Sequence, residues 1–259
     1  MKNIAFMPGC SLSSYSPESV LNVLYLLKQN FNNVSAIQKC CGMPTLVMGQ
    51  RELFVRRYES LEEDIKHLDI DEVVVACQNC FLTLKEHSTD IKTTSLWTLI
   101  PEVGLPKEFK NKAKDSDVVF SIQDSCPTRN YTDIHDGIRW ILKELGYKYL
   151  ESKNSRENSM CCGQGGMVAT VNPELSHRIA QKAASEFNTD YVVTYCAACR
   201  SSMYKAGKES YHILDLIFGP VIYKNTKSPQ DVLASPIKSW TNRYKSKKII
   251  KSIIKKNTG

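Results

Sequence analysis

The sequence predicts an α/β fold made of two similar parallel-sheet domains that arose by an internal duplication. Three observations support this prediction. The 259-residue chain carries the same order of cysteines twice, a short β-branched run precedes each Cys-x-x-Cys pair, and strand-like segments alternate with amphipathic helices. Such alternation is typical of a mostly parallel sheet covered on both faces. We expect domains at residues 1–110 and 111–223, followed by a basic C-terminal tail at 224–259.

The ten cysteines form two sets of five, and none lies outside them. Each set consists of a single cysteine, then Cys-Cys-Gly, then Cys-x-x-Cys. Three matching pairs are 116, 121 and 119 residues apart. The first set is Cys10, Cys40, Cys41, Cys77 and Cys80, and the second is Cys126, Cys161, Cys162, Cys196 and Cys199. The repeat therefore predicts one equivalent site in each half.

The segments next to the cysteines repeat as well. Residues 72–77 and 191–196 are β-branched runs that predict buried strands, and each ends at the first cysteine of a Cys-x-x-Cys pair. Residues 3–7 and 117–123 predict the strands that lead to Cys10 and Cys126. Residues 95–100 and 212–217 predict a short amphipathic helix in each half.

Two longer helices have clear start signals. Ser16-Pro17 and Asn172-Pro173 each place a capping side chain before a proline, which suits the first turn of a helix. The linker between the halves is expected at residues 101–117, a polar stretch with two prolines.

The predicted topology places the cysteines where a ligand would bind. In parallel sheets, ligands bind beyond the carboxyl ends of the strands, and Cys77 and Cys196 lie there. Each Cys-x-x-Cys then opens a helix, whose free N–H groups and positive dipole end favour thiolates and an anionic cluster. Gly42 and Gly163 follow the paired cysteines, where we expect a backbone without Cβ to pass close to a bulky cluster.

The number of thiols indicates the kind of site. A zinc ion takes four ligands, and a cubane [4Fe–4S] cluster usually takes four thiolates, so five cysteines leave one to spare. Adjacent cysteines reach two different irons more easily than they chelate one tetrahedral ion. The pattern predicts an iron–sulfur cluster larger or more open than a cubane. Zinc stays an alternative in either half, whereas a disulfide framework is disfavoured in a chain of this length.

The cysteine order resembles that of a known family. Cys, Cys-Cys-Gly and Cys-x-x-Cys, with Met7-Pro-Gly-Cys10 and Met160-Cys-Cys-Gly163, are similar to the cysteine-rich CCG domain, which occurs twice in the catalytic subunit of heterodisulfide reductase. The resemblance covers residues 1 to about 220. It implies that each set of five cysteines binds a non-cubane [4Fe–4S] cluster, with cluster irons rather than a side chain performing the chemistry.

The same resemblance implies a redox subunit that reduces a disulfide or a related sulfur substrate. Relatives also include iron–sulfur subunits of lactate and glycolate oxidation, so a non-catalytic electron-transfer subunit is the second hypothesis, and a zinc-stabilised scaffold is the third. The sequence contains no Walker motif and no flavin or nicotinamide signature. We therefore expect the electrons to come from an iron–sulfur or flavin partner subunit.

The charge is concentrated in the tail. The net charge is +7, yet residues 238–259 hold eight of the 34 basic residues and none of the 27 acidic ones, so the rest of the chain has a net charge of −1. The high isoelectric point is therefore no argument for nucleic-acid binding. The first residues lack the pattern of a signal peptide, and no apolar run is long enough to span a bilayer. We expect a cytoplasmic protein.

The tail has two interpretations. It is either a solvated basic arm or a short amphipathic helix, with Ile249, Ile250, Ile253 and Ile254 on one face, that lies on an anionic membrane surface or an acidic partner. Four polar residues near the cysteines are candidates for contacts with an anionic substrate or with cluster sulfurs: Arg129, Asn130, Gln164 and Arg200. An ordinary capping or surface role is the alternative for each.

Overall fold

The computed structural model describes the backbone of residues 2–255 and the side chains of residues 2–253. Contacts divide the chain into two units. The first unit runs to Leu99 and also includes the chain from Ser235 onward, and the second unit is Ile100–Ala234. The domain boundaries expected at residues 110 and 223 stay a prediction about where the repeats end.

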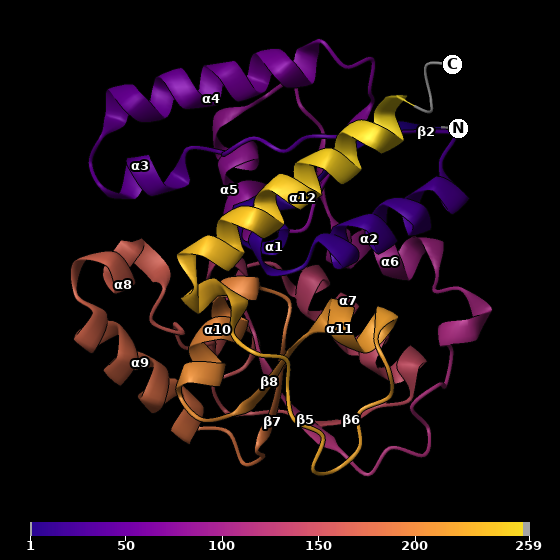
Figure 1. The fold of residues 1–259 in the computed structure, drawn as a ribbon, viewed down its shortest axis with the longest axis vertical. Coiled ribbons are helices and arrows are strands. Elements are labelled where there is room, and N and C mark those ends of the chain that lie inside the picture. Colours follow the sequence, from indigo (N-terminus) through magenta and orange to yellow (C-terminus); the bar gives the residue numbers. More distant parts are fainter. Residues whose placement is uncertain (1, 256–259) are drawn as a thin grey trace. The chain divides into compact units, whose positions relative to one another are not determined.

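The first unit contains a four-stranded parallel sheet with the strand order β2-β1-β3-β4 (Figure 1). The central strands are apolar and buried, since Ile4, Phe6, Val73 and Val74 are almost fully covered. The strands are β1 (Asn3–Met7), β2 (Asn33–Ala36), β3 (Glu72–Val75) and β4 (Thr93–Ser95). The helices that belong to this unit are α1 (Gly9–Tyr15), α2 (Pro17–Asn30), α3 (Met43–Val47), α4 (Arg51–Lys66), α5 (Gln78–His87) and α12 (Pro236–Lys255), and α6 (Leu96–Val103) leads out of it.

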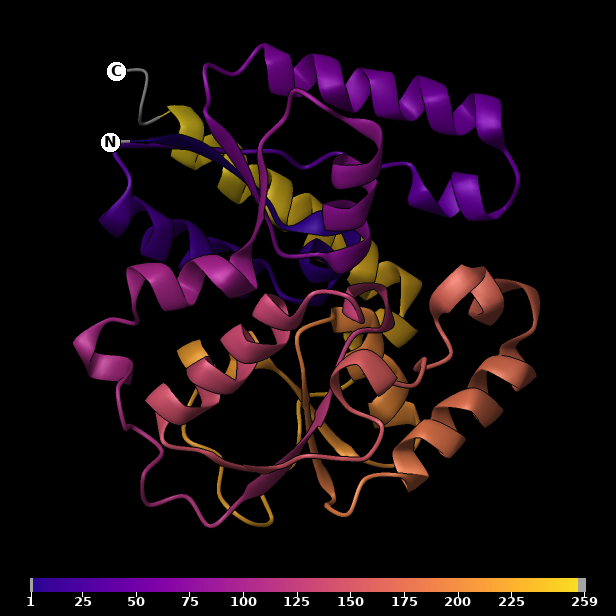
Figure 2. The same cartoon turned by 180° about the vertical axis from the view of Figure 1, so that it is seen from behind.

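The second unit repeats this topology with the order β6-β5-β7-β8, again all parallel (Figure 2). The strands are β5 (Val119–Gln123), β6 (Lys148–Leu150), β7 (Tyr191–Thr194) and β8 (Glu209–His212). The α-helices are α7 (Thr132–Leu145), α8 (Val168–Val171), α9 (Pro173–Ser185), α10 (Ala197–Lys205) and α11 (Ile213–Phe218). The fold class is confirmed: both halves have the same strand order, as a duplication requires.

The local start signals act as expected. The Ser16 Oγ accepts a hydrogen bond from the Ser19 N–H at 3.0 Å, and the Asn172 Oδ1 accepts one from the Leu175 N–H at 2.9 Å. These side chains cap α2 and α9, and a proline occupies the first turn of each helix. The strands β4 and β6 lack a predictive pattern because each has only three residues and carries polar side chains.

The expected linker at residues 101–117 is packed into the second unit. Leu105 and Ala113 are buried, and the Lys112 Nζ donates to the carbonyl oxygens of Ile217 and Gly219, both at 2.8 Å. The polar composition of this segment does not make it a free connector, because its few apolar side chains and its lysine find partners on one side.

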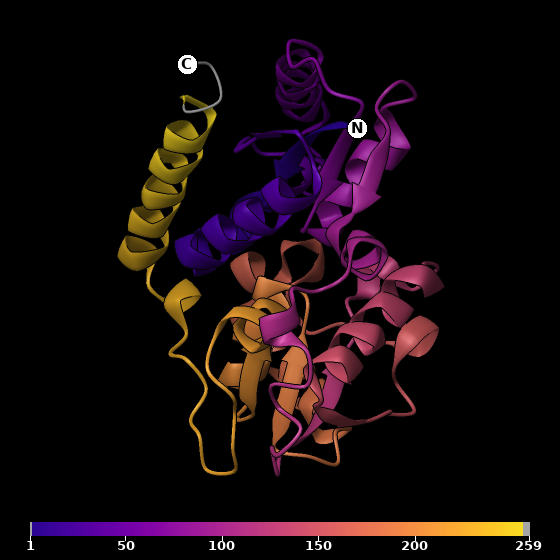
Figure 3. The same ribbon diagram turned by 90° about the vertical axis from the view of Figure 1, so that its right-hand side faces the viewer.

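The C-terminal segment forms the long helix α12, which packs against α1, α2 and β2 of the first unit (Figure 3). The interpretation as a solvated arm is therefore wrong for residues 236–255. Ile250 and Ile253 face inward and are 4% and 6% exposed. Ile254 lies outside the described side chains. No helix in the described part of the chain is long and apolar enough to cross a bilayer.

Candidate functional site

The first set of cysteines lies beyond the carboxyl ends of β1, β2 and β3. Cys10 is in the first turn of α1, directly after β1, and Cys40 and Cys41 lie in the loop between β2 and α3. Cys77 is the N-cap of α5, and Cys80 is in its first turn. Parallel strands bring these three connections to the same edge of the sheet, so residues that are far apart in the chain become neighbours.

The thiols of the first set contact one another. The Cys10 thiol donates to Cys40, which lowers the pKa of Cys40 to about 6 and raises the pKa of Cys10. Cys80 forms hydrogen bonds with Cys41 and Cys77, and its bond to Cys41 lowers the pKa of Cys41. A Cβ built on Gly9 would lie 2.4 Å from the Cys77 Cβ, so only glycine allows the loops after β1 and β3 to approach this closely. The first set is thus one contiguous group of sulfur atoms.

The second set has the same placement. Cys126 begins a short 3₁₀ turn (Cys126–Thr128) after β5, the paired cysteines follow a loop after β6, and Cys196 is the N-cap of α10. Hydrogen bonds between thiols connect all five residues in the order Cys126, Cys161, Cys162, Cys199 and Cys196.

These contacts divide the charge unequally within the second set. Hydrogen bonds from Cys126 and Cys162 lower the pKa of Cys161 to about 2. The bond from Cys199 lowers the pKa of Cys196 to about 7, whereas the bond to Cys161 raises the pKa of Cys162 to about 12. A thiolate is the form that binds metal, and the low pKa of Cys161 keeps this residue in that form at neutral pH.

Backbone N–H groups also point at the sulfur atoms. The Gly42 N–H donates to the Cys40 Sγ at 3.5 Å, and the Gly163 N–H donates to the Cys161 Sγ at 3.3 Å. Both glycines have a positive φ, 85° and 90°. A Cβ would meet the Phe54 ring at 2.8 Å in the first case and the Ser176 carbonyl oxygen at 2.4 Å in the second. The glycines are therefore required by the turn and by protein packing, which corrects the expectation that they give space to a cluster.

The chemistry of the donor set fits an iron–sulfur centre. Each group consists of thiols only, placed at the start of a helix and surrounded by N–H donors, which stabilise thiolate and cluster sulfur. Among the described residues, no three His, Cys, Asp or Glu side chains are arranged to hold a single metal ion. The ligand roles of the ten cysteines stay a prediction.

The family model for a cysteine-rich domain, CCG, matches this chain twice, at residues 4–85 and 120–204. The chain belongs to the CCG cysteine-rich domain family. Each match contains one complete set of five cysteines, so the two halves of the structure are two CCG domains.

Relatives of this CCG protein are iron–sulfur proteins and reductase subunits. An uncharacterized iron–sulfur protein of Methanococcus maripaludis is 28% identical over 82% of this chain and 41% of its own length. One subunit of the dihydromethanophenazine:CoB–CoM heterodisulfide reductase of Methanosarcina acetivorans is 25% identical over 78% of this chain and 53% of its own length. A probable glycolate oxidase iron–sulfur subunit of Bacillus subtilis is 24% identical over 69% and 43%. The chain spans about half the length of these relatives.

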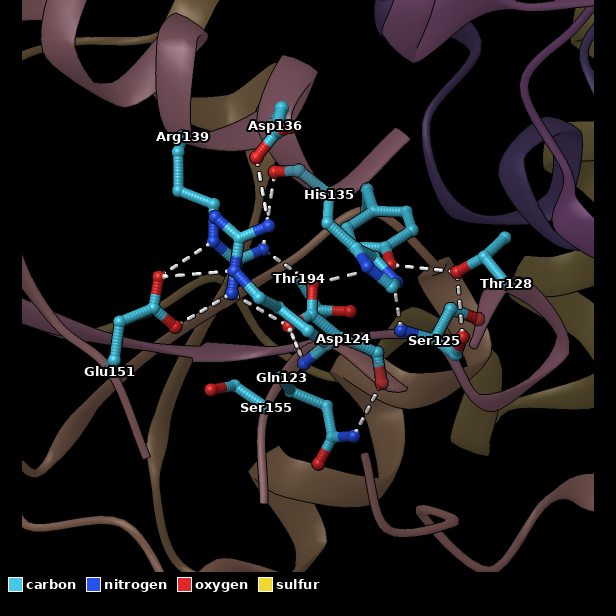
Figure 4. A network of polar contacts seen from close by, with 12 residues as sticks. Gln123, Asp124, Ser125, Thr128, His135, Asp136, Arg139, Glu151, Ser155 and Thr194 are labelled. Carbon is cyan, nitrogen blue, oxygen red and sulfur yellow. Dashed lines mark hydrogen bonds and ion pairs between the residues drawn. The ribbon is translucent and has the colours of Figure 1, made fainter. Parts of the chain in front are cut away.

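The second CCG domain holds its cysteine loops with a buried polar network (Figure 4). Asp124 is fully buried two residues before Cys126 and accepts two hydrogen bonds from the Arg139 guanidinium, both at 2.7 Å. Arg139 also donates to the Glu151 carboxylate at 2.8 Å. The hydrogen bonds from Arg139 lower the pKa of Glu151. Both carboxylates are thus held by one arginine.

Tyr195 extends this network to the other cysteine loop. Its hydroxyl lies 3.3 Å from the Asp124 Oδ1 and accepts a hydrogen bond from the Ser125 N–H at 3.0 Å. Because Tyr195 immediately precedes Cys196 and Ser125 immediately precedes Cys126, this bond fixes the spacing between the two cysteine-bearing segments. The positions that match Asp124 and Tyr195 in the first CCG domain are Pro8 and Ala76, which lack such side chains.

The four polar candidates from the sequence have different fates. Arg200 is fully buried, and its guanidinium donates to the carbonyl oxygens of Ser210, Pro229 and Gln230, so it anchors a loop. Arg129 donates to the Ser159 carbonyl oxygen through two nitrogens at 2.6 and 2.9 Å. For both arginines the structural interpretation applies. Asn130 is exposed and Gln164 is half-buried.

Sequence reasoning missed the residues that act from outside the motifs. Asp124 had one usable signal, a charged residue at the end of a buried strand. Arg139 lies in the middle of a helix and Arg243 lies in the tail, so nothing in their local sequence connects them to the cysteines.

Proposed function

We propose that this CCG protein is an iron–sulfur redox subunit that resembles the catalytic subunit of heterodisulfide reductase and reduces a disulfide or related sulfur substrate. The observation that supports the proposal most is the contiguous group of five thiols in each half, because the two groups fit two clusters, non-cubane ones by analogy with the family. The heterodisulfide reductase relative supports the same reaction class.

The proposed reaction is a two-electron reduction. One S–S bond breaks, two electrons and two protons are consumed, and two thiols form. The electrons come from a partner subunit that carries iron–sulfur clusters or a flavin. When bound, the clusters supply one-electron transfer and iron that is open to sulfur. The chain's own contribution is to hold ten cysteine sulfurs, to donate N–H groups to them, and to direct the N-termini of α5 and α10 at the two sites.

A specific observation favours a second candidate. The probable glycolate oxidase subunit is also a relative, which supports a non-catalytic electron-transfer subunit of a lactate- or glycolate-type dehydrogenase complex. The two functions differ in one property. A reductase needs a site that its sulfur substrate can reach, whereas a carrier needs only its clusters.

Anaerobically prepared protein should contain about eight irons and as much acid-labile sulfide, which corresponds to two clusters with about four irons each. Metal analysis together with EPR spectroscopy measures both the number of irons and the cluster type. Stoichiometric zinc without iron, after anaerobic reconstitution, would establish the zinc-stabilised scaffold instead.

Disulfides and thiols should change the EPR signal of the oxidised protein if the chain is the reductase. An accessible iron binds sulfur directly, so adding a panel of small disulfides and thiols, including coenzyme thiols, should shift the signal. Sulfur-free alcohols of the same size serve as the control. A spectrum that responds to potential only, and to no member of the panel, would establish the carrier function.

The outer face of α12 is proposed to dock on an anionic bilayer surface, which would make this cytoplasmic subunit peripheral to a membrane. Ile237, Trp240 and Tyr244 are 80%, 74% and 54% exposed, and exposed lysines accompany them. Near an anionic bilayer, each lysine contributes about 1 kcal/mol. Aromatic side chains suit the bilayer interface.

Sedimentation with phosphatidylglycerol vesicles tests this docking. Binding should fall steeply with salt, and Trp240→Ser combined with Lys251→Gln should weaken it. Deletion of α12 is a poor test because its inner face belongs to the core of the first unit. Binding that ignores both salt and the substitutions, or that requires an acidic partner subunit, would refute the membrane assignment.

A further inference from the structure

A cleft of about 690 Å³ opens beside the first set of cysteines. This volume is in the range of small-molecule sites. Cys10 and Cys40 form part of its wall, so a molecule in the cleft would lie next to the first CCG site.

The rest of the lining is cationic and contains no carboxylate. It includes Lys39, Arg56, Arg57 and Arg243. Lys39 is already paired, with Asp64 at 2.7 Å. Among the described side chains, the three arginines have no carboxylate within ion-pair distance, and all three are exposed. Three guanidinium groups around one cleft repel one another unless an anion lies between them. Arginine also matches the geometry of carboxylate and phosphate oxygens.

Arg243 connects this charge to the cysteines. Its Nη2 lies 3.7 Å from the Cys10 Sγ. Hydrogen bonds between α12 and the first unit hold it there. The Gln38 Nε2 donates to the Arg243 carbonyl oxygen at 3.0 Å, and the Ser246 hydroxyl donates to the Ser13 carbonyl oxygen at 2.9 Å.

The two CCG domains differ in this respect. α12 follows both repeats in the sequence, so the duplication supplies only one such helix, and it packs on the first unit. A helix from outside the CCG motif thus contributes a charged residue to one site of two.

We propose that the cleft formed by α4, the loop before Cys40 and α12 binds the carboxylate or phosphate group of a small anionic substrate, with Arg56, Arg57 and Arg243 as donors. This assignment rests on the proposed function for the reaction that follows binding, and it makes the first CCG site the one that recognises the substrate.

Calorimetric titration of the anaerobic holoprotein with inorganic phosphate and with succinate, at constant ionic strength set by NaCl, tests the assignment. The wild-type protein should bind at least one of the two probes, and the better probe identifies the preferred group. Arg243→Gln and Arg57→Gln should each weaken binding about tenfold, which corresponds to about 1.4 kcal/mol. Arg51→Gln, on the same helix as Arg57 but outside the cleft, should change binding less than about twofold.

Iron content and EPR spectra of each variant show whether the clusters are intact, and Arg57→Gln keeps the test valid if Arg243→Gln disturbs the packing of α12. Absence of binding for both probes overturns the assignment, as does an equal loss in Arg51→Gln. If disulfides still perturb the EPR signal while neither anion binds, the anion cleft is wrong and the proposed function stands. If the anions bind and no sulfur compound acts, the opposite holds.

Discussion

Cys162→Ser should remove one cluster and leave the other intact, with the loss of about half of the iron. Cys162 contacts both Cys161 and Cys199, so serine at this position interrupts the middle of the second group of thiols. Its hydroxyl is a much weaker ligand for iron than a thiolate. Because the two groups lie in separate units, the first group keeps its geometry. Iron analysis and the EPR spectrum of the reduced or oxidised protein measure the result.

Cys41→Ser is the matched control, because it makes the same change in the first unit. It should remove the complementary part of the spectrum, so the two difference spectra should add up to that of the wild-type protein. Full iron content in either variant would refute the assignment of the paired cysteines as ligands. Loss of all iron in either variant would refute the independence of the two sites.

Asp124→Asn should lower the free energy of unfolding of the second unit by about 3–5 kcal/mol. This is the usual cost when one partner of a buried ion pair is removed and the other charge stays uncompensated. Arg139 is almost fully buried and would keep Glu151 as its single carboxylate partner. The loss should also loosen the contact between the segments before Cys126 and Cys196, so the second cluster should be released at a lower denaturant concentration.

Asp136→Asn provides the matched control in the same network. Asp136 pairs with Arg156 at 2.8 Å, but its side chain is 62% exposed. Such surface pairs contribute about 0–1 kcal/mol. Chemical denaturation under anaerobic conditions, followed by circular dichroism and by cluster absorbance, compares the two variants. Equal stability of Asp124→Asn and Asp136→Asn would show that the buried pair does not hold the second site together.

The duplication could be predicted because it is written in local patterns. The strands β1, β3, β5 and β7 have apolar runs and each leads to a cysteine, and the caps of α2 and α9 consist of two adjacent residues. In parallel sheets, strand ends meet at one edge, so the clustering of the cysteines in each half follows from the order of the elements.

The roles of individual charged residues could not be predicted in the same way. Arg200 adjoins Cys199 in the chain, yet it points into the core and binds three carbonyl groups. Asp124 and Arg139 are 15 residues apart and become a pair only when α7 packs near the end of β5. Adjacency in sequence is a poor guide here, because a long side chain is directed by the packing of its helix and not by its neighbours in the chain.

The sequence by itself determined the two sets of thiols, the parallel α/β topology and the family, because each depends on short motifs and on the periodicity of apolar residues. The tertiary structure alone decided which side chains surround the thiols. It placed the apolar face of α12 against the first unit and so brought Arg243 to Cys10 across 233 positions of the chain. It also buried the Asp124–Arg139 pair beside the second site alone. Contacts between residues so distant in sequence depend on how complete helices pack, which no local pattern specifies.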